Sequence, residues 1–294
     1  MTYWRCETVR TQHVGIFGYP LGHSISPAFQ QAALDYHGVP ATYHAWPVPP
    51  DRLADEVARL RGVDYLGANV TVPHKEHVRE YLDEIDPWAQ SIGAVNTIVR
   101  EGSRLVGYNT DAYGFIKSLN KVGGFDPDGK RVVILGAGGA ARAAVFGLAE
   151  EGISSLTIAN RTLQRAQSLA DEVSGSIAAV EAISVSGPSL ADACADAQLI
   201  VNCTSIGMRH SETEGSTPLD ANLIPAGSLV YDMVYNPPRT PLLLAAAQAG
   251  ANAVGGLSML IYQGAAAFEH WTGKEAPIEV MFRAGEQALA STFP

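Results

Sequence analysis

The stretch "VVILGAGGAARAAVFGLAEEG", residues 132–152, decides the expected fold of the second half of the chain. Apolar residues typical of a buried strand lead into a glycine-rich turn, and an alanine-rich segment of helical composition follows. Gly136, Gly138 and Ala141 fit G-x-G-x-x-G/A, and this strand–turn–helix setting is typical of dinucleotide binding, although a tight turn without a ligand is the alternative. Missing side chains let the backbone approach a pyrophosphate, whose charge the helix N-terminus favours. The residues expected at the pyrophosphate are Gly136, Ala137, Gly138, Gly139 and Ala140.

The strand after this turn indicates which dinucleotide the chain would bind. It ends in "SLTIANRTLQRA", residues 155–166, where an NAD site usually has Asp or Glu about 20 residues beyond the glycines for the ribose 2′-hydroxyl. No carboxylate is present here. Two guanidiniums and two neutral hydrogen-bonding groups suit a 2′-phosphate instead, because arginine binds phosphate with a bidentate fork. An exposed, positively charged helix start is the alternative. We predict NADP, bound by Asn160, Arg161, Thr162 and Arg165.

Short apolar strands alternate with helical segments along most of the chain, which predicts an α/β fold with mainly parallel sheets. Strands are expected at 13–18, 41–48, 65–72, 155–160, 199–205 and 228–235, with two more around a turn at 101–103. Helices are expected over 27–37, over 51–61 and beyond 258. Pro27 is typical of a helix start, and Asp51 is an N-cap candidate. The polar stretch 207–222 predicts a loop, and the Gly- and Asp-rich stretch 120–131 marks a domain edge.

Composition limits the class of protein. The 294 residues are 47% hydrophobic, which is typical of a globular protein, and a net charge of −10 argues against a broad nucleic-acid surface. No uncharged apolar run approaches the roughly 20 residues of a membrane span, and the start "MTYWRCETVR" lacks the apolar core of a secretory signal. The three cysteines, Cys6, Cys194 and Cys203, are odd in number and lack C-x-x-C spacing, and the histidines are scattered singly along the chain. We therefore predict reduced thiols, no metal site and a cytoplasmic protein.

Two charged residues far apart in the chain each allow two interpretations. In "GANVTVPHKEHV", residues 67–78, an alternating apolar run ends in a proline, and Lys75 follows. Burying an unpaired ammonium costs several kcal/mol, so Lys75 either points into solvent or has a dedicated partner. Asp111 precedes the helical stretch "AYGFIKSLN" and, taken alone, is an N-cap candidate.

Several dense segments, in this order and at these spacings, resemble the shikimate dehydrogenase family over most of the chain. They are "GYPLGHSISP" (18–27), "NVTVPHK" (69–75), "GAVNT" (93–97), "GYNTD" (107–111), "NCTSIGM" (202–208), "YDMVYNPPRTPLL" (231–243) and "GGLSMLIYQGA" (255–265). The resemblance implies an open α/β catalytic domain over 1–115 and a Rossmann-type NADP domain over 116–257. C-terminal helices over 258–294 are expected to return to the first domain, with the active site in the cleft.

The resemblance also implies the reaction and the site residues. Family members reversibly reduce 3-dehydroshikimate to shikimate with NADPH, a step toward chorismate and the aromatic amino acids. The expected catalytic pair is Lys75 and Asp111. The expected substrate contacts are Ser24, Ser26, Thr71, Asn96, Tyr235 and Gln263. Met233 and Gly256 are expected beside the nicotinamide. The chemistry agrees, because a positioned cation stabilises the charge that hydride transfer develops on a ketone oxygen.

Several alternatives stay open at this stage. The family usually has His-Asn where this chain has Gln30 and Gln31, which we expect to support the helix rather than to take part in chemistry. Quinate is a rival substrate, although the presence of both Ser24 and Ser26 favours shikimate. A non-catalytic NADP or metabolite sensor would be expected to have lost Lys75 or Asp111. Other two-domain Rossmann enzymes, such as methylene-tetrahydrofolate dehydrogenase or glutamyl-tRNA reductase, fit the serine pair less well. The chain is expected to be a monomer or a homodimer.

Overall fold

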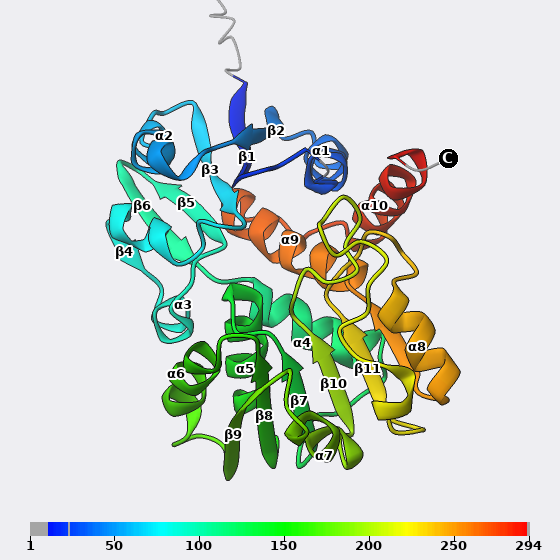
Figure 1. The fold of residues 1–294 in the computed structure, drawn as a ribbon. Helices are drawn as coiled ribbons and strands as arrows, with labels where there is room; N and C mark the ends of the chain where they lie inside the picture. The colour runs from blue at the N-terminus through cyan, green and yellow to red at the C-terminus, as the bar shows by residue number, and fades with distance from the viewer. Residues whose placement is uncertain (1–10, 23, 293–294) are drawn as a thin grey trace, which may run out of the picture.

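Two six-stranded sheets organise the part of the chain that the structure describes (Figure 1). A computed structural model provides the coordinates and describes residues 11–22 and 24–292. The first sheet has the order β2-β1-β3-β5-β6-β4, and the second has the order β12-β11-β10-β7-β8-β9. The strands of the first are β1 (Gln12–Gly18), β2 (Ala41–Pro47), β3 (Tyr65–Val70), β4 (Glu84–Ile85), β5 (Thr97–Glu101) and β6 (Arg104–Tyr108). Those of the second are β7 (Arg131–Leu135), β8 (Ser155–Asn160), β9 (Ala179–Ser184), β10 (Leu199–Asn202), β11 (Leu229–Asp232) and β12 (Asn252–Gly255).

The second sheet is parallel throughout, whereas the first is mixed because β5 runs antiparallel to both of its neighbours, β3 and β6. The helices among the described residues are α1 (Ser26–Tyr36), α2 (Leu53–Arg59), α3 (Pro87–Ile92), α4 (Asp111–Lys121), α5 (Gly139–Glu150), α6 (Leu163–Val173), α7 (Ser189–Ala195), α8 (Pro241–Ala249), α9 (Leu257–Thr272) and α10 (Ile278–Thr292). The predicted fold class is confirmed, including the strand pair around residues 101–103.

Two strands of the second sheet end earlier than the sequence predicts. β10 ends at Asn202, whose side-chain oxygen accepts a hydrogen bond from the N–H of Thr204 at 3.0 Å. β11 ends at Asp232, whose Oδ1 accepts one from the N–H of Val234 at 3.0 Å. A side chain that bonds the backbone two residues on favours a turn over an extended strand. The apolar residues beyond these points therefore belong to loops at the carboxyl edge of the sheet.

The prediction that Asp51 caps a helix is wrong. Asp51 lies inside a short 3-10 turn, Pro50–Arg52, and α2 starts at Leu53 without a side-chain cap. The short strands β4, β9 and β12 lack strong apolar patterns, which is why composition alone does not reveal them. At the predicted polar loop, the chain carries only the 3-10 turn Ala221–Leu223 as regular structure.

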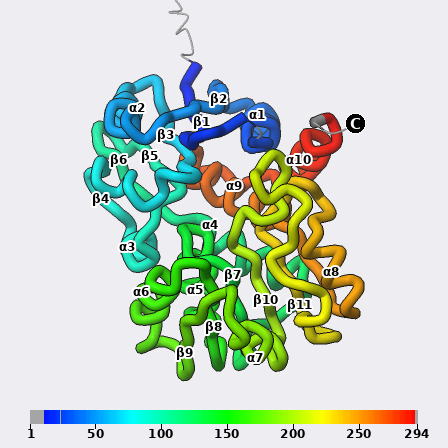
Figure 2. The backbone as a smooth tube through the Cα atoms, viewed as in Figure 1, coloured from blue at the N-terminus to red at the C-terminus, as the bar shows by residue number. Residues whose placement is uncertain are grey.

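Helix α9 returns the chain to the first sheet, as expected. In Figure 1 it runs between the two sheets, and α10 lies beside α1; Figure 2 shows the same path from the second sheet back to the first. The indole N–H of Trp271, near the end of α9, donates a hydrogen bond of 2.9 Å to the carbonyl oxygen of Ile98 in β5. Gly67 of β3 has no room for a side chain, since a Cβ would lie 2.8 Å from that indole nitrogen. Close packing thus joins the C-terminal helices to the first sheet.

The domain limits predicted from the sequence, 1–115, 116–257 and 258–294, stay a proposal. Helix α4 crosses the first of them and packs on both α9 and α5. Among the described helices, none is long and apolar enough to cross a membrane. Cys194 and Cys203 are free thiols, and Cys6 lies outside the described residues.

Candidate active site

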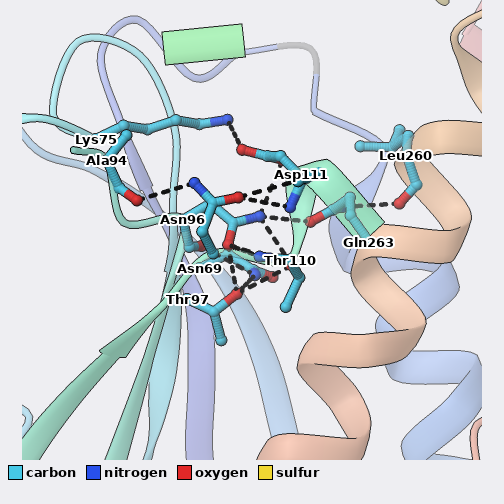
Figure 3. Close-up of polar contacts among 11 residues, drawn as sticks. Asn69, Lys75, Ala94, Asn96, Thr97, Thr110, Asp111, Leu260 and Gln263 are labelled. Carbon is cyan, nitrogen blue, oxygen red and sulfur yellow. Dashed lines mark hydrogen bonds and ion pairs between the residues drawn. The ribbon is translucent and has the colours of Figure 1, made fainter. Parts of the chain in front are cut away.

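Lys75 lies in a loop that follows β3, and the backbone of this loop is held from two sides. His74 is buried, and its Nε2 lies 2.6 Å from the carbonyl oxygen of Val48. The carbonyl oxygen of Lys75 accepts a hydrogen bond of 2.8 Å from the N–H of Val95, just ahead of β5. With its backbone fixed, Lys75 directs its side chain toward the start of α4 (Figure 3).

Asp111 is the partner of this lysine. Nζ of Lys75 and Oδ2 of Asp111 are 2.7 Å apart, with 16% and 6% of the two side chains exposed. Pairing offsets much of the cost of withdrawing the two charges from water. Asp111 does not cap α4, because Oδ1 of Asn109 accepts the N–H groups of Asp111 and Ala112 at 3.0 and 3.4 Å. The interpretations as a solvated lysine and a capping aspartate are therefore wrong.

Asn96 holds the other oxygen of Asp111 (Figure 3). Its Nδ2 donates to Oδ1 of Asp111 at 2.9 Å and to Oγ1 of Thr110 at 2.9 Å, and lies 3.2 Å from Oε1 of Gln263. Its Oδ1 accepts the N–H of Thr110 at 2.8 Å. A primary amide has two N–H donors, and here they face three acceptors. Asn96 thus orients the carboxylate and has no donor to spare in this arrangement.

A cavity of about 140 Å³ lies beside the ion pair, and we call it the inner cavity. Its polar wall consists of Ser26, Asn69, Thr71, Lys75, Asn96, Asp111 and Gln263. Its apolar wall consists of Ile16, Val70, Ala140, Met233, Gly256, Met259 and Leu260. The hydroxyls of Ser26 and Thr71 have no hydrogen-bond partner among the described residues, so both are available to a polar ligand.

Two of the predicted substrate residues lie outside this wall. Ser24 sits in the turn before α1, where its hydroxyl oxygen accepts the N–H of Ser26 at 3.3 Å. Tyr235 borders a neighbouring cavity of about 360 Å³, and burial raises the pKa of its hydroxyl. Gly256 belongs to the walls of both cavities, so the cavity that Tyr235 borders adjoins the inner cavity at this residue.

The loop that brings Met233 to the inner cavity is anchored by a buried carboxylate. Asp232 is fully buried at the end of β11 and accepts hydrogen bonds from Oγ1 of Thr240 at 2.5 Å and from Nδ2 of Asn202 at 2.9 Å. Desolvation raises the pKa of this carboxyl, and the hydrogen bonds oppose the rise. A Cβ at Gly256 would lie only 2.1 Å from the carbonyl oxygen of Met233, so glycine is required for this approach.

The glycine-rich turn opens a second space of about 390 Å³, which we call the outer cavity. Gly136 has a φ of +112°, which favours glycine, and a Cβ at Gly138 would meet nothing within 4 Å. Helix α5 begins at Gly139 without a side-chain cap, so its first N–H groups can bind an anion. Lys75 and Ala140 line both cavities. This open turn fits the pyrophosphate of a dinucleotide whose reactive end reaches the ion pair.

The residues predicted to bind a 2′-phosphate differ from one another in their surroundings. Asn160 is the last residue of β8. Its side-chain amide donates a hydrogen bond of 2.9 Å to the carbonyl oxygen of Thr162, which shapes the turn before α6. Arg161 is exposed. Arg165 lines the outer cavity, and its Nη2 lies 3.8 Å from Oε1 of Glu76 on the opposite wall. Two arginines are thus available to an anionic ligand beside the turn.

The two glutamines that depart from the family pattern both hold helix α1 in place. Nε2 of Gln30 donates a hydrogen bond of 2.8 Å to the carbonyl oxygen of Gly264 in α9. Oε1 of Gln31 accepts the N–H of Tyr43 in β2 at 2.8 Å. Asn69, although it touches the inner cavity, accepts the hydroxyl of Tyr43 at 2.7 Å and acts as a brace. The contacts of the two glutamines are structural, as the sequence predicts.

Two residues near the site have roles that the sequence pattern does not single out. Asn109 caps α4, and the local signal was available, since Asn shortly before a helical stretch is a common cap. Glu76 faces Arg165 across the outer cavity, and no local signal reveals a contact between segments so far apart. Among residues 11–22 and 24–292, no group of three or more His, Cys, Asp or Glu side chains could hold a metal ion.

A parallel sheet with an open glycine turn, facing a buried lysine–aspartate pair across adjoining cavities, defines the class as a dinucleotide-dependent oxidoreductase. Comparison with known families identifies the member of this class. Residues 16–98 match the shikimate dehydrogenase substrate binding domain, 119–210 match shikimate / quinate 5-dehydrogenase, and 256–284 match the shikimate 5′-dehydrogenase C-terminal domain. The chain belongs to the shikimate dehydrogenase family, which confirms the predicted resemblance.

Individual relatives cover nearly the whole chain. A protein of Symbiobacterium thermophilum named shikimate dehydrogenase (NADP(+)) is 48% identical over 280 residues, covering 94% of each chain. The crystal structure of the Thermus thermophilus shikimate 5-dehydrogenase with NADP(H) and shikimate superposes with a TM-score of 0.84 at 38% identity, covering 95% of this chain and 100% of that one. Quinate dehydrogenase of Corynebacterium glutamicum with NAD has a TM-score of 0.83 at 30% identity, covering 94% of this chain and 99% of that one.

Proposed function

We propose that this chain reversibly reduces 3-dehydroshikimate to shikimate with NADPH. The observation that carries the proposal is the buried pair of Lys75 and Asp111, 2.7 Å apart, at the junction of the inner and outer cavities. The names of the curated relatives state the same activity and cofactor, so the predicted function, enzyme class and cofactor are confirmed at the level of the family. A non-catalytic sensor is not favoured, since the pair is intact.

The roles of the side chains follow from charge and geometry. When bound, NADPH supplies the hydride. Lys75 stabilises the negative charge that develops on the ketone oxygen, and the pair with Asp111 supplies the proton that completes the alcohol. Asp111 holds the ammonium in position, and Asn96 fixes the carboxylate in turn. Because both side chains of the ion pair are largely buried, their field at the oxygen is only weakly screened by water.

The substrate contacts are assigned to the polar wall of the inner cavity. Ser26 and Thr71 have hydroxyls there without a hydrogen-bond partner among the described residues, and these suit a carboxylate and ring hydroxyls. Gln263 has one amide hydrogen left after its bond to the carbonyl oxygen of Leu260. Ser24 and Tyr235 remain assigned to the substrate by the family motif. Ser24 is joined to Ser26 of the inner wall by a hydrogen bond of 3.3 Å, and Tyr235 lines the neighbouring cavity together with Gly256.

A direct assay tests this function. Purified protein supplied with shikimate and NADP is expected to produce NADPH, seen as a rise in absorbance at the NADPH band. A protein that binds NADP but leaves the absorbance unchanged with shikimate and quinate, and that consumes no NADPH when supplied with 3-dehydroshikimate, would show that the site is not a dehydrogenase of this kind.

Quinate is expected to be the poorer substrate. It carries an additional hydroxyl beside the carboxylate, and a site without a partner for that group rejects it by only about 100-fold. We therefore expect kcat/KM for quinate to be lower than for shikimate by up to roughly that factor. Steady-state rates with both acids and both dinucleotides measure the ratio. Equal or higher kcat/KM for quinate would reassign the chain within its family.

Removal of Arg161 tests the cofactor assignment. Arg161→Ala should reduce kcat/KM for NADP by roughly 10- to 100-fold, since hydrogen bonds to a charged group contribute about 1.5–3 kcal/mol, and should leave NAD almost unaffected. Arg283→Ala, which removes an exposed arginine on α10, is the control. An unchanged preference for NADP over NAD in Arg161→Ala would place the 2′-phosphate elsewhere.

Location and assembly are also part of the proposal. Free thiols at Cys194 and Cys203 agree with a reducing compartment, and we propose the cytoplasm. The proposed partners are small molecules, without nucleic acid or membrane, and the chain is proposed to act as a monomer or homodimer. Light scattering on the purified protein distinguishes the two assemblies.

A further inference from the structure

Arg142 makes contacts that cross from the second sheet to the first. It lies in the first turn of α5, directly behind the glycine turn. Its guanidinium forms a bidentate pair with Glu172 of α6, with Nη1–Oε1 at 3.0 Å and Nη2–Oε2 at 2.5 Å. Its Nε donates to the carbonyl oxygen of Ile92, the last residue of α3, on the side of the first sheet. Only 17% of the side chain is exposed.

The turn after α3 is shaped around this guanidinium. Gly93 has a φ of +74°, and a Cβ at this position would lie 2.6 Å from Nη2 of Arg142. The carbonyl oxygen of Gly93 accepts a hydrogen bond of 3.1 Å from Arg79, which holds the turn from the other side. The backbone conformation therefore favours glycine here, and a side chain at this position would also displace the guanidinium of Arg142.

The same segment holds the backbone of Lys75. Two residues after Gly93, the N–H of Val95 donates to the carbonyl oxygen of Lys75 at 2.8 Å. A chain of direct contacts thus leads from Arg142, through the carbonyl oxygen of Ile92 and the segment 92–95, to the lysine. The chain is supported by a small apolar cluster between the sheets, consisting of Ile92, Ala94, Ala112 and Ala143, with Trp88 and Phe146 packed against it.

We propose that Arg142 is a positioning residue, which couples the start of α5 to the backbone of Lys75 through residues 92–95. The proposal rests on the proposed function, in which the dinucleotide lies on the α5 turn and Lys75 acts on the ketone. Hydride transfer requires the two to keep a fixed separation, and a displacement of about 1 Å can cost roughly 100-fold in rate. Arginine suits the position because its planar guanidinium places two N–H groups on the two carboxylate oxygens of Glu172 and a third on the carbonyl oxygen of Ile92, a fixed geometry that the single ammonium nitrogen of lysine does not reproduce.

Kinetics of Arg142→Met give the first test. We expect kcat for shikimate to fall roughly 10- to 100-fold, with the Kd for NADP within about threefold of wild type. Arg142→Lys should restore only part of the loss. Arg131→Met is the matched control, because the exposed side chain of Arg131 binds only the carbonyl oxygen of Asp196 within the part of the chain that the structure describes. Arg142→Met with wild-type kcat, or with a loss explained entirely by weaker NADP binding, would overturn the proposal.

Hydrogen exchange gives a second test that needs no activity. In Arg142→Met the peptide that contains residues 92–96 should exchange faster than in wild type, and in Arg131→Met it should not. If Arg142→Met does not fold, Glu172→Gln, which weakens the bidentate pair, should show the same pattern to a smaller extent. Unchanged exchange at 92–96 overturns the coupling even if kcat falls. Wild-type protein inactive on shikimate would refute the proposed function, and exchange would still decide whether Arg142 holds this segment.

Discussion

Replacement of Lys75 by alanine is expected to lower kcat for shikimate oxidation by roughly 10³-fold, while NADP still binds. In the proposed mechanism, the change removes the ammonium that stabilises the ketone oxygen and, with it, the proton path through Asp111. No other lysine or arginine among the described residues lines the inner cavity, so no second cation is placed to compensate. The turn proposed to bind the dinucleotide uses backbone groups of Gly138 and Gly139, which the substitution leaves in place although Lys75 also lines this cavity.

The measurement compares turnover with binding. kcat and KM come from the absorbance assay, and the Kd for NADP comes from titration of the purified variant. Lys274→Ala, which removes an exposed lysine after α9, is the control and should behave as wild type. A Lys75→Ala protein that retains more than about a tenth of wild-type kcat would remove the lysine from the chemistry, because general acid–base groups contribute at least about 10²-fold.

Features that depend on neighbouring residues were predictable from the sequence. The glycine turn before α5 was predictable, because the strand, the glycines and the helix lie within one stretch and all three indicate the same local structure. The hairpin of β5 and β6 was predictable for the same reason. The ends of β10 and β11 were not predictable. There the side-chain oxygens of Asn202 and Asp232 accept backbone N–H groups two residues further along the chain, and a turn replaces the extended pattern.

The site was predictable in its members but not in its connections. Motifs identify Lys75, Asp111 and Asn96, but only coordinates show that the donors of Asn96 are all engaged, which makes it a support for Asp111. The contacts of Arg142 with Ile92 and of Arg165 with Glu76 depend on how the two sheets are placed. No periodicity or spacing within one segment carries that information.

Asp111→Asn is the second substitution with a large expected effect, a fall in kcat of roughly 10²- to 10³-fold. The amide oxygen can still accept the hydrogen bond from Asn96, but the amide nitrogen would face the ammonium of Lys75, donor against donor. The lysine would then turn away from its position beside the inner cavity. kcat falls because the cation is misplaced and the proton path is cut, whereas the dinucleotide turn is unaffected.

Helix α4 provides the means to distinguish this effect from a loss of stability. Asn109, rather than Asp111, accepts the first N–H groups of the helix, so Asp111→Asn should leave Tm nearly unchanged. Asn109→Ala, in contrast, removes the cap and should cost about 1 kcal/mol of unfolding free energy. Asp55→Asn, at an exposed ion pair with Arg52, is the control for loss of a carboxylate. If Asp111→Asn melts several degrees lower but turns over at the wild-type rate, the carboxylate serves the helix and the assignment of a catalytic pair is lost.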